Sequence, residues 1–391
     1  MIANRSLPFF LTRSDRVDGR RVLGVLVFAS VLALAVSGCG VRDAGAATTA
    51  EAPTHELVTL SPVYTVDRLY RSMTGPYDTT ELHLAEADAK PEIYWITGYR
   101  AIMVGPDGET PMPQDFMCHS NLDIDPRRHR ASLPASQGFS SRLFTLSQGQ
   151  LDIDFPAGFG IPVVSTEALS LTTQVLNLNL EETNTEVRHK VTLKYQKQSE
   201  LGGPLVPLFP IGAYGLRALE GSSHHYGVDR ADDEAHGPGC LPGESASAHD
   251  YTDQHGNVFT GHWVVEPGRE VNHTLVTNLM QVPYDTTIHY IAVHLHPFAE
   301  SLTLIDRTTG ETLFEAKAKG FDDRIGLSTV DSLSSVEGIP VYRGHEYELV
   351  SVYDNPTDEA QDAMAVMYIY LRDQRLQARM QAGIDLGAAT R

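Results

Sequence analysis

Short runs of β-branched and aromatic residues recur along this chain, separated by turn residues, and no other feature constrains its fold as strongly. Examples are EIYWITGYRAIMV, LSLTTQVLNLNLE, NVFTGHWVVEPG and HEYELVSVYDN. The run IDRTTGETLF predicts a hairpin with Thr309 and Gly310 at its turn. The chain also contains 22 prolines and 32 glycines, which disfavour long helices. Together these features predict an all-β protein.

A change in composition divides the chain into two β-rich parts. Between residues 201 and 257, Pro, Gly, Ser, His and Asp accumulate, so we expect an irregular connection there. It separates an N-terminal domain at 55–200 from a C-terminal domain at 258–372, and the tail at 373–391 begins as a surface helix. About 350 residues remain after the N-terminal targeting segment, which is enough for two domains. We therefore expect two consecutive antiparallel β-sandwich domains of jelly-roll-like type.

The N-terminus has the pattern of a targeting segment. Two arginines precede an apolar run at 22–36, which is too short to cross a membrane readily as a permanent helix. The run ends in Val-Ser-Gly-Cys39, which resembles the cleavage box of bacterial lipoproteins. This resemblance implies that 1–38 is a signal peptide, that Cys39 is lipidated and that 39–54 is a flexible tether. The protein would then be anchored to a membrane of the bacterial cell envelope, facing the periplasm or the exterior; an uncleaved signal anchor is the alternative.

The charge of the chain restricts its partners. The formal net charge is −20 at pH 7. Such a surface repels nucleic acid and anionic lipid and suits an exported soluble domain. We therefore expect no nucleic-acid partner.

The chain has only three cysteines. If Cys39 is lipidated, Cys118 and Cys240 remain, and an oxidising cell envelope permits a disulfide between them. Cys118 also precedes His119, and a Cys–His pair can hold a metal ion. Both possibilities for Cys118 stay open.

A candidate metal site lies near the C-terminal end. His294 and His296 stand two positions apart in a predicted strand. Residues two apart share one face of a strand, so both imidazoles point the same way, roughly 7 Å apart along it. Met364, in DAMAVMYIYL, adds a soft thioether, and soft ligands select Cu(I) over zinc or calcium. The three residues together predict a copper site.

From residue 259 to residue 371, the chain resembles the C-terminal domain of the copper type II, ascorbate-dependent monooxygenases. That family includes peptidylglycine α-hydroxylating monooxygenase and dopamine β-monooxygenase. Four segments carry the resemblance, and they occur in the family's order: VVEPGREV, IHYIAVHLH, VYRGHEYELVSVYDN and DAMAVMYIYL.

The resemblance implies a catalytic copper held by His294, His296 and Met364. In this family that copper binds O2 and hydroxylates a C–H bond, with electrons from ascorbate or another reductant. Met367 is the competing methionine, but it lies on the opposite strand face, and the gap from Met364 to Tyr368 suits the family pattern better. The substrate, a small molecule or a peptide, is not indicated by the sequence.

The N-terminal half resembles the family more faintly, over roughly 92–195, through FPAGFGIPV and LTTQVLNLN. Where the family carries a histidine ligand of its second copper, this chain has Leu176. The family's adjacent pair of histidines appears as Cys118 and His119. The first-domain site is therefore degenerate, and one copper per chain is expected.

Other histidines have weaker claims. A histidine-rich stretch in the connection could supply metal ligands, although histidines in solvated loops more often have no such role. The candidate residues of this stretch are His224, His225, His236, Cys240, His249 and His255. His189 lies in a strand pattern and is expected to be half-buried with its hydrogen bonds satisfied.

Three alternatives to a monooxygenase remain. The degenerate first site favours a non-catalytic copper-binding lipoprotein for storage, delivery or sensing. The spacing of His294, His296 and Glu300 also fits the core of a cupin motif, with Glu300 as a ligand of iron, manganese or zinc, although the flanking glycines of that motif are missing. Finally, two histidines on a half-buried strand could simply bond to backbone carbonyls.

Overall fold

The computed structural model describes residues 52–383, except 87, 135, 139–140, 220–224 and 228–249. In this part of the chain, strands far outnumber the short helices, so the predicted all-β class is confirmed. The proposed signal peptide, the lipidation site Cys39 and the histidine-rich stretch from His236 to His249 lie outside the described residues. No helix in the described part is long and apolar enough to cross a bilayer.

The first sandwich consists of two antiparallel sheets. One has the spatial order β1 (His55–Leu60), β10 (Thr185–Lys197), β4 (Ile93–Val104) and β8 (Phe159–Val164), with β2 (Tyr64–Val66) beside β10 and β7 (Asp152–Asp154) beside β4. The other has the order β3 (Tyr77–His83), β9 (Ala168–Val175), β5 (Met117–Ile124) and β6 (Arg142–Leu146). Alternate residues of these strands point inward and form one hydrophobic core.

The second sandwich packs a four-strand segment against a five-stranded sheet. The first has the order β11 (Val206–Tyr214), β24 (Ala365–Arg372), β17 (Thr286–Leu295) and β21 (Leu333–Val341). The second has the order β16 (Gly268–Leu275), β22 (Tyr347–Asn355), β18 (Ala299–Asp306), β19 (Glu311–Gly320) and β20 (Leu327–Val330). Their inward-facing side chains form a second core. The predicted hairpin is present as β18 and β19, with Gly310 at a positive φ of 77° in its turn.

Short elements complete the described chain. Two 3-10 helices and three α-helices are present: η1 (Gln114–Phe116), η2 (Gln198–Glu200), α1 (Pro126–Ser132), α2 (Thr277–Met280) and α3 (Gln374–Gln381). The helix expected in the tail is α3, which begins after Asp373, whose carboxylate accepts a hydrogen bond from the Leu376 N–H at 2.9 Å. The remaining strands form two small sheets: β12 (Arg217–Ala218), β13 (Asp250–Thr252) and β14 (Val258–Thr260) in one, β15 (Trp263–Val265) and β23 (Gln361–Ala363) in the other.

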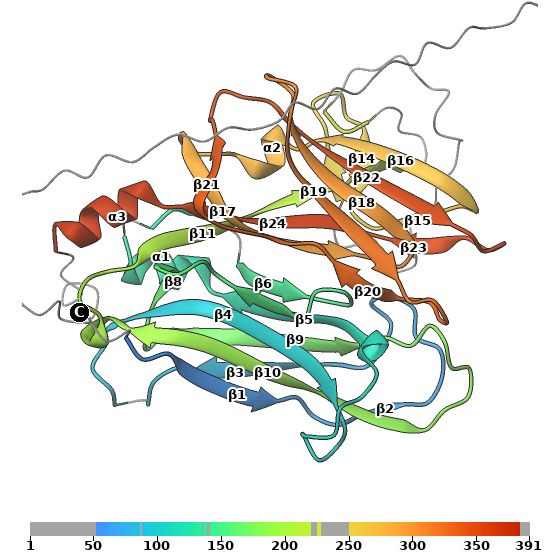
Figure 1. Cartoon of the computed structure of the whole chain (residues 1–391), viewed down its shortest axis with the longest axis horizontal. Coiled ribbons are helices and arrows are strands. Elements are labelled where there is room, and N and C mark those ends of the chain that lie inside the picture. Colours follow the sequence, from blue (N-terminus) through green and yellow to red (C-terminus); the bar gives the residue numbers. More distant parts are fainter. Residues whose placement is uncertain are drawn as a thin grey trace, which may run out of the picture. The chain divides into compact units, whose positions relative to one another are not determined.

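The two sandwiches share a sheet, as Figure 1 shows near its centre. β8 of the first sandwich pairs in parallel with the start of β11, and β11 continues antiparallel to β24 of the second. The expectation of an irregular connection throughout 201–257 was therefore wrong. The strand β11 was not predicted because it contains Pro207 and Pro210, and proline is rare in strands. Pro210 is tolerated because β8 pairs only with the first two residues of β11, which leaves the rest of that side without a ladder. Pro207 lies at the start of the strand, before the first pair with β24.

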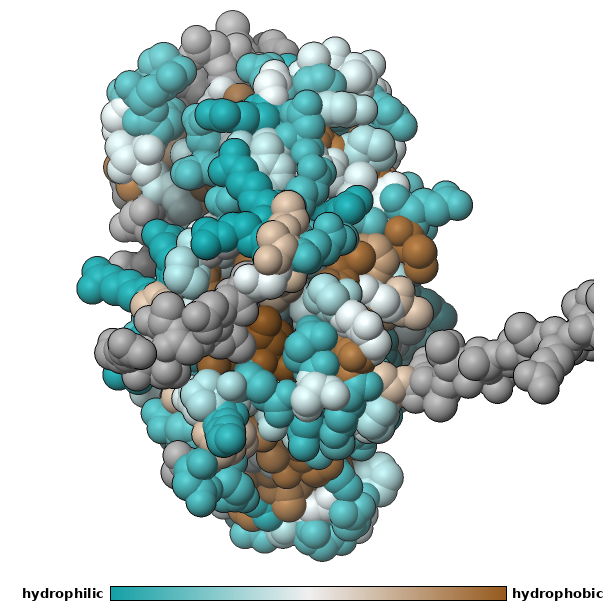
Figure 2. Space-filling view, turned by 90° about the vertical axis from the view of Figure 1, so that its left-hand side faces the viewer, coloured by the Kyte–Doolittle hydropathy of each residue, from teal (hydrophilic) through white to brown (hydrophobic). Residues whose placement is uncertain are grey.

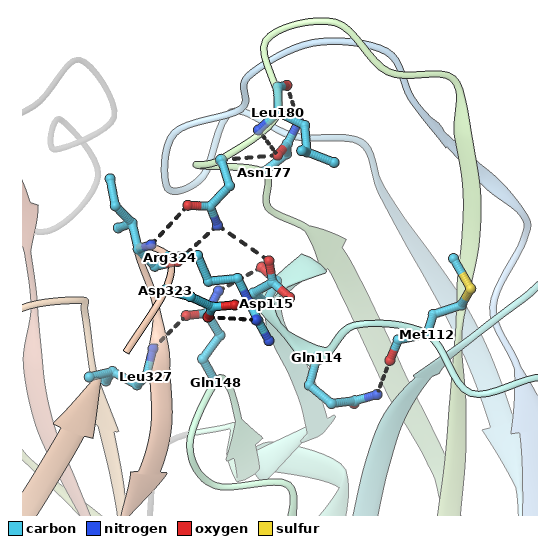
Figure 3. A network of polar contacts seen from close by, with 11 residues as sticks. Met112, Gln114, Asp115, Gln148, Asn177, Leu180, Asp323, Arg324 and Leu327 are labelled. Atoms are coloured by element: carbon cyan, nitrogen blue, oxygen red, sulfur yellow. Dashed lines mark hydrogen bonds and ion pairs between the residues drawn. The ribbon is translucent and has the colours of Figure 1, made fainter. Parts of the chain in front are cut away.

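A polar network also links the sandwiches (Figure 3). Arg324, in the loop before β20, places its Nε 3.3 Å from Asp115 Oδ1 in η1. Gln148 donates to the Asp115 carbonyl at 2.7 Å and accepts from the Leu327 N–H at 3.0 Å. Because η1 leads directly into β5, this network holds the start of β5 against the second sandwich.

The face shown in Figure 2 is mostly hydrophilic, with hydrophobic side chains gathered in separate patches. Exposed large hydrophobic side chains among the described residues include Met73, which is 45% exposed. Scattered exposure of this kind is normal. Met73 matters because it also lines the cavity that lies between the sandwiches.

Candidate metal centre

Strand β17 presents its two terminal histidines toward the first sandwich. Val293 and Leu295 pack in the second core, whereas His294 and the residue after the strand, His296, face the other way. Both imidazoles are buried, and their ring centroids lie 5.2 Å apart with the planes nearly perpendicular at 87°. His294 and His296 therefore lie on the same face, as the sequence predicted.

Met364 lies beside this pair. β23 ends at Ala363 and β24 begins at Ala365, which is opposite Leu295 of β17. Met364 lines the same cavity as the histidines, whereas Met367 is fully buried in the core of the second sandwich. The sequence-based choice of Met364 over Met367 agrees with this geometry.

Tyr353 holds these two segments in place. Its hydroxyl donates to the Met364 carbonyl oxygen at 2.6 Å and accepts from the His296 N–H at 3.4 Å. From the first sandwich, Ser72 Oγ approaches His296 Nδ1 at 3.4 Å. The same imidazole also forms a hydrogen bond with the backbone of Asp362.

The first sandwich supplies Cys118 and His119 to the same cavity. Neighbouring residues of a regular strand point to opposite faces. Here the register against β9 shifts between Met117 and His119, so a β-bulge at Cys118 breaks the alternation. Bulges of this kind re-aim side chains. Both Cys118 and His119 consequently line the cavity with His294 and His296.

The cavity has a volume of about 240 Å³ and lies between the sandwiches. One wall carries the histidines and Met364. The first sandwich contributes polar side chains that include Arg142, whose Nε donates to Asp123 at 2.8 Å and whose Nη1 donates to Thr145 at 2.8 Å. The lining residues are Met73, Cys118, His119, Asn121, Ser141, Arg142, Thr145, Tyr214, Tyr251, Gly261, His294, His296, Met364, Val366 and Tyr368.

Burial keeps the cavity histidines neutral. Burial lowers the pKa of His119 to about 3, with further contributions from His294 and Arg142. Burial, His262 and Arg142 lower the pKa of His294 to about 4. The pKa of His296 is also well below its ordinary value, chiefly because of burial. A neutral imidazole has a free lone pair for a metal ion at neutral pH.

Cys118 is a buried, free cysteine. The possible disulfide with Cys240 is therefore not present, and Cys240 itself lies outside the described residues. Burial raises the pKa of the Cys118 thiol to about 11. The thiol is therefore protonated at neutral pH, and a metal ion would have to displace its proton on binding. Of the predicted first-domain pair, His119 keeps the stronger claim.

His262 was not predicted from the sequence as a residue of the site. His262, just before β15, is buried, and its ring centroid lies 5.3 Å from that of His296 at an interplanar angle of 80°. Its Nε2 lies 3.7 Å from Asp362 Oδ1. Only the pairing of β15 with β23, which ends next to Met364, brings His262 here. The segment GHWVV carries no local signal of this pairing.

The residues fit a metal ion in part. Nδ1 of His294 is buried and has no hydrogen-bond partner among the described residues. This is the state expected of a ligand atom, because buried polar atoms are normally satisfied. In the same part of the chain, no group of three or more His, Cys, Asp or Glu side chains has the geometry of a metal site. A site of two histidines and a methionine contains only two residues of those types.

The other predicted candidates lie elsewhere. Glu300 is exposed and paired with Arg269 at 3.2 Å, so the ligand set expected of a cupin is not assembled. His225 is hydrogen-bonded to the His273 carbonyl oxygen at 3.0 Å, and His255 is exposed. His224, His236, Cys240 and His249 lie outside the described residues.

His189 differs from its expectation. It is fully buried rather than half-buried, and neither of its ring nitrogens has a hydrogen-bond partner among the described residues. Its closest ring neighbour is Tyr64, edge to face, with centroids 6.1 Å apart. Leu176, for which the sequence predicted no role as a ligand, is buried and apolar.

Comparison with known proteins identifies no family for this chain. No family model matches it, and no curated protein matches it. Among solved structures, it is similar to a peptide-N(4)-(N-acetyl-β-D-glucosaminyl) asparagine amidase, with 9% identity, a TM-score of 0.33 and coverage of 82% of this chain and 96% of that one. PNGase F, a glycosylasparaginase from Flavobacterium meningosepticum, gives 8% identity, a TM-score of 0.32 and coverage of 82% and 96%. The STIV MCP gives 10% identity, a TM-score of 0.27 and coverage of 81% of this chain and 99% of that one. Similarity this distant has no bearing on the site.

Proposed function

We propose that this chain is a copper-dependent monooxygenase that hydroxylates an aliphatic C–H bond with O2 and a reductant such as ascorbate. The observation that carries the proposal is the cavity in which His294, His296 and Met364 of one sandwich face His119 of the other. Copper bound there would supply redox activation of O2. One oxygen atom would enter the C–H bond and the other would leave as water, with two electrons and two protons from the reductant.

The side chains that line the cavity would have different roles in binding the metal ion and the substrate. His294 and His296 would hold the metal ion through neutral imidazoles, and Met364 would favour Cu(I) through its soft sulfur. Arg142 of the first sandwich and Tyr214 and Tyr368 of the second would orient a substrate, because they supply donors to the same cavity. A volume of about 240 Å³ admits a small molecule or the end of a peptide. By burying the site, the two sandwiches would limit the access of water.

A non-catalytic copper-binding protein is the second candidate. Leu176 cannot bind a metal ion, and a thiol with a pKa of about 11 leaves His119 as the remaining donor of the predicted first-domain site. One copper held by the second sandwich alone would suit storage, delivery or sensing. In either case we propose attachment to a membrane of the cell envelope through Cys39.

The deciding experiment is the copper content of the mature chain, produced from residue 39 with Cys39→Ser and loaded anaerobically with Cu(I). Binding that is lost on His294→Ala supports the proposed site. His289→Gln is the matched control, because His289 is a buried histidine on β17 whose ring nitrogens contact Ser335 O at 2.9 Å and Thr287 Oγ1 at 2.7 Å. Absence of copper from the wild-type chain would refute both candidates. If copper binds, reductant-dependent O2 uptake coupled to substrate oxidation separates enzyme from carrier.

A further inference from the structure

We infer that His262 is a third imidazole ligand of the metal ion held by His294 and His296, so that the centre contains three histidines and Met364. The inference rests on the proposed function in one respect: a metal ion must bind at this position. It changes the expected ligand set from two nitrogens and one sulfur to three nitrogens and one sulfur.

Two strand ladders meet at Met364 and bring His262 to the site. In one, Trp263 of β15 lies opposite Ala363 of β23. In the other, Leu295 of β17 lies opposite Ala365 of β24. His262 and His296 are the residues next to these two pairs, and Met364 lies between Ala363 and Ala365. Both histidines therefore belong to the segments that pair next to this methionine.

The ring positions agree with this register. The centroid of His296 lies 5.3 Å from that of His262 and 5.2 Å from that of His294, and both contacts are edge to face. Metal–nitrogen bonds of about 2.0–2.1 Å place the centres of two imidazoles on one ion roughly 5 Å apart. Both spacings thus suit a shared ion, although the three rings do not converge on one point in this structure and would have to turn toward the ion.

The surroundings of His262 are those of an oriented ligand. Its backbone N–H donates to Thr260 Oγ1 at 3.2 Å, and its carbonyl oxygen accepts from the same hydroxyl at 3.1 Å. Asp362 Oδ1 lies 3.7 Å from its Nε2. Metal-binding histidines commonly have a carboxylate beside the nitrogen that does not bind the ion, which sets the orientation of the ring. A purely structural His262 would instead interact with Asp362 and take no part in metal binding.

The test counts imidazole nitrogens on bound copper. Pulsed electron paramagnetic resonance of the Cu(II)-loaded mature chain should give three for the wild type and two for His262→Gln, while His289→Gln keeps three. His119→Gln shows which sandwich supplies the third nitrogen: three nitrogens in that variant support His262, and two assign the position to His119. Loss of His262 should also weaken Cu(I) binding at least about tenfold, the smallest loss typical of changes beside a metal ligand.

The outcomes separate the two proposals. A wild-type chain without copper refutes the proposed function itself. Copper that is lost on His294→Ala but shows only two imidazoles, unchanged in His262→Gln, overturns the role of His262 and leaves the proposed function intact. Thermal unfolding of each variant shows whether it is folded. If His262→Gln is not folded, the wild-type count read together with His119→Gln still decides the case.

Discussion

The imidazoles of His294 and His296 lie nearly perpendicular, with centroids 5.2 Å apart, on the side of β17 that faces the first sandwich. This arrangement follows from two residues at alternate positions of one strand. What surrounds the pair depends on segments from both sandwiches.

Replacing Met364 by Ile should weaken Cu(I) binding by about tenfold or more and Cu(II) binding much less. Isoleucine keeps the apolar volume but removes the soft sulfur. Competition with chelators specific for each oxidation state measures both affinities. Equal losses of both would mean that Met364 is only a packing residue.

His189→Leu should make stability less sensitive to acid. Burial lowers the pKa of His189 to about 3, from an ordinary value of 6.5. Below pH 6.5 the unfolded chain therefore takes up a proton that the folded chain refuses until about pH 3, so the wild type loses about 1.4 kcal/mol for each pH unit in this window and nothing above it. At pH 5 the variant should gain about 2 kcal/mol relative to the wild type, beyond any difference at pH 7.5.

Urea unfolding at the two pH values measures this gain. The other buried histidines are common to both proteins, so their contribution cancels in the comparison. The same difference in unfolding free energy at both pH values would show that His189 binds its proton equally in the folded and unfolded chains.

Cys118 should resist thiol reagents in the native protein. It is buried, and its pKa of about 11 keeps the thiol protonated at pH 8, whereas the thiolate is the reactive form. Alkylation at pH 8 with and without denaturant, followed by peptide mapping, distinguishes Cys118 from Cys39 and Cys240. Rapid native labelling, or recovery of a Cys118–Cys240 disulfide, would contradict this view.

Gln148→Ala should destabilise the fold by about 1–3 kcal/mol. The change leaves the N–H of Leu327, a buried residue, without the acceptor it has at 3.0 Å (Figure 3). Denaturant unfolding measures the loss. Thr79→Ala, which removes an exposed hydroxyl contact between β3 and β9, serves as a control. Equal stability of the two variants would mean that Gln148 does not hold the sandwiches together.

Much of the architecture could be predicted from local pattern. Alternating apolar residues marked most strands, and the hairpin turn at Gly310 was readable because a residue at positive φ favours glycine. β11 was missed because Pro207 and Pro210 are unusual in strands. Their tolerance depends on which neighbours pair with each edge, and that is settled by the assembled sheet.

The sequence by itself determined which residues share a face: the spacing of His294 and His296, and the separation of Met364 from Met367, follow from the two-residue period of a strand. Only the tertiary structure decided what they face. The bulge at Cys118 turns His119 into the cavity, and the pairing of β15 with β23 brings His262 beside His296. Both depend on register between distant segments. Register is set by packing of the whole sheet, and no local run of residues encodes it.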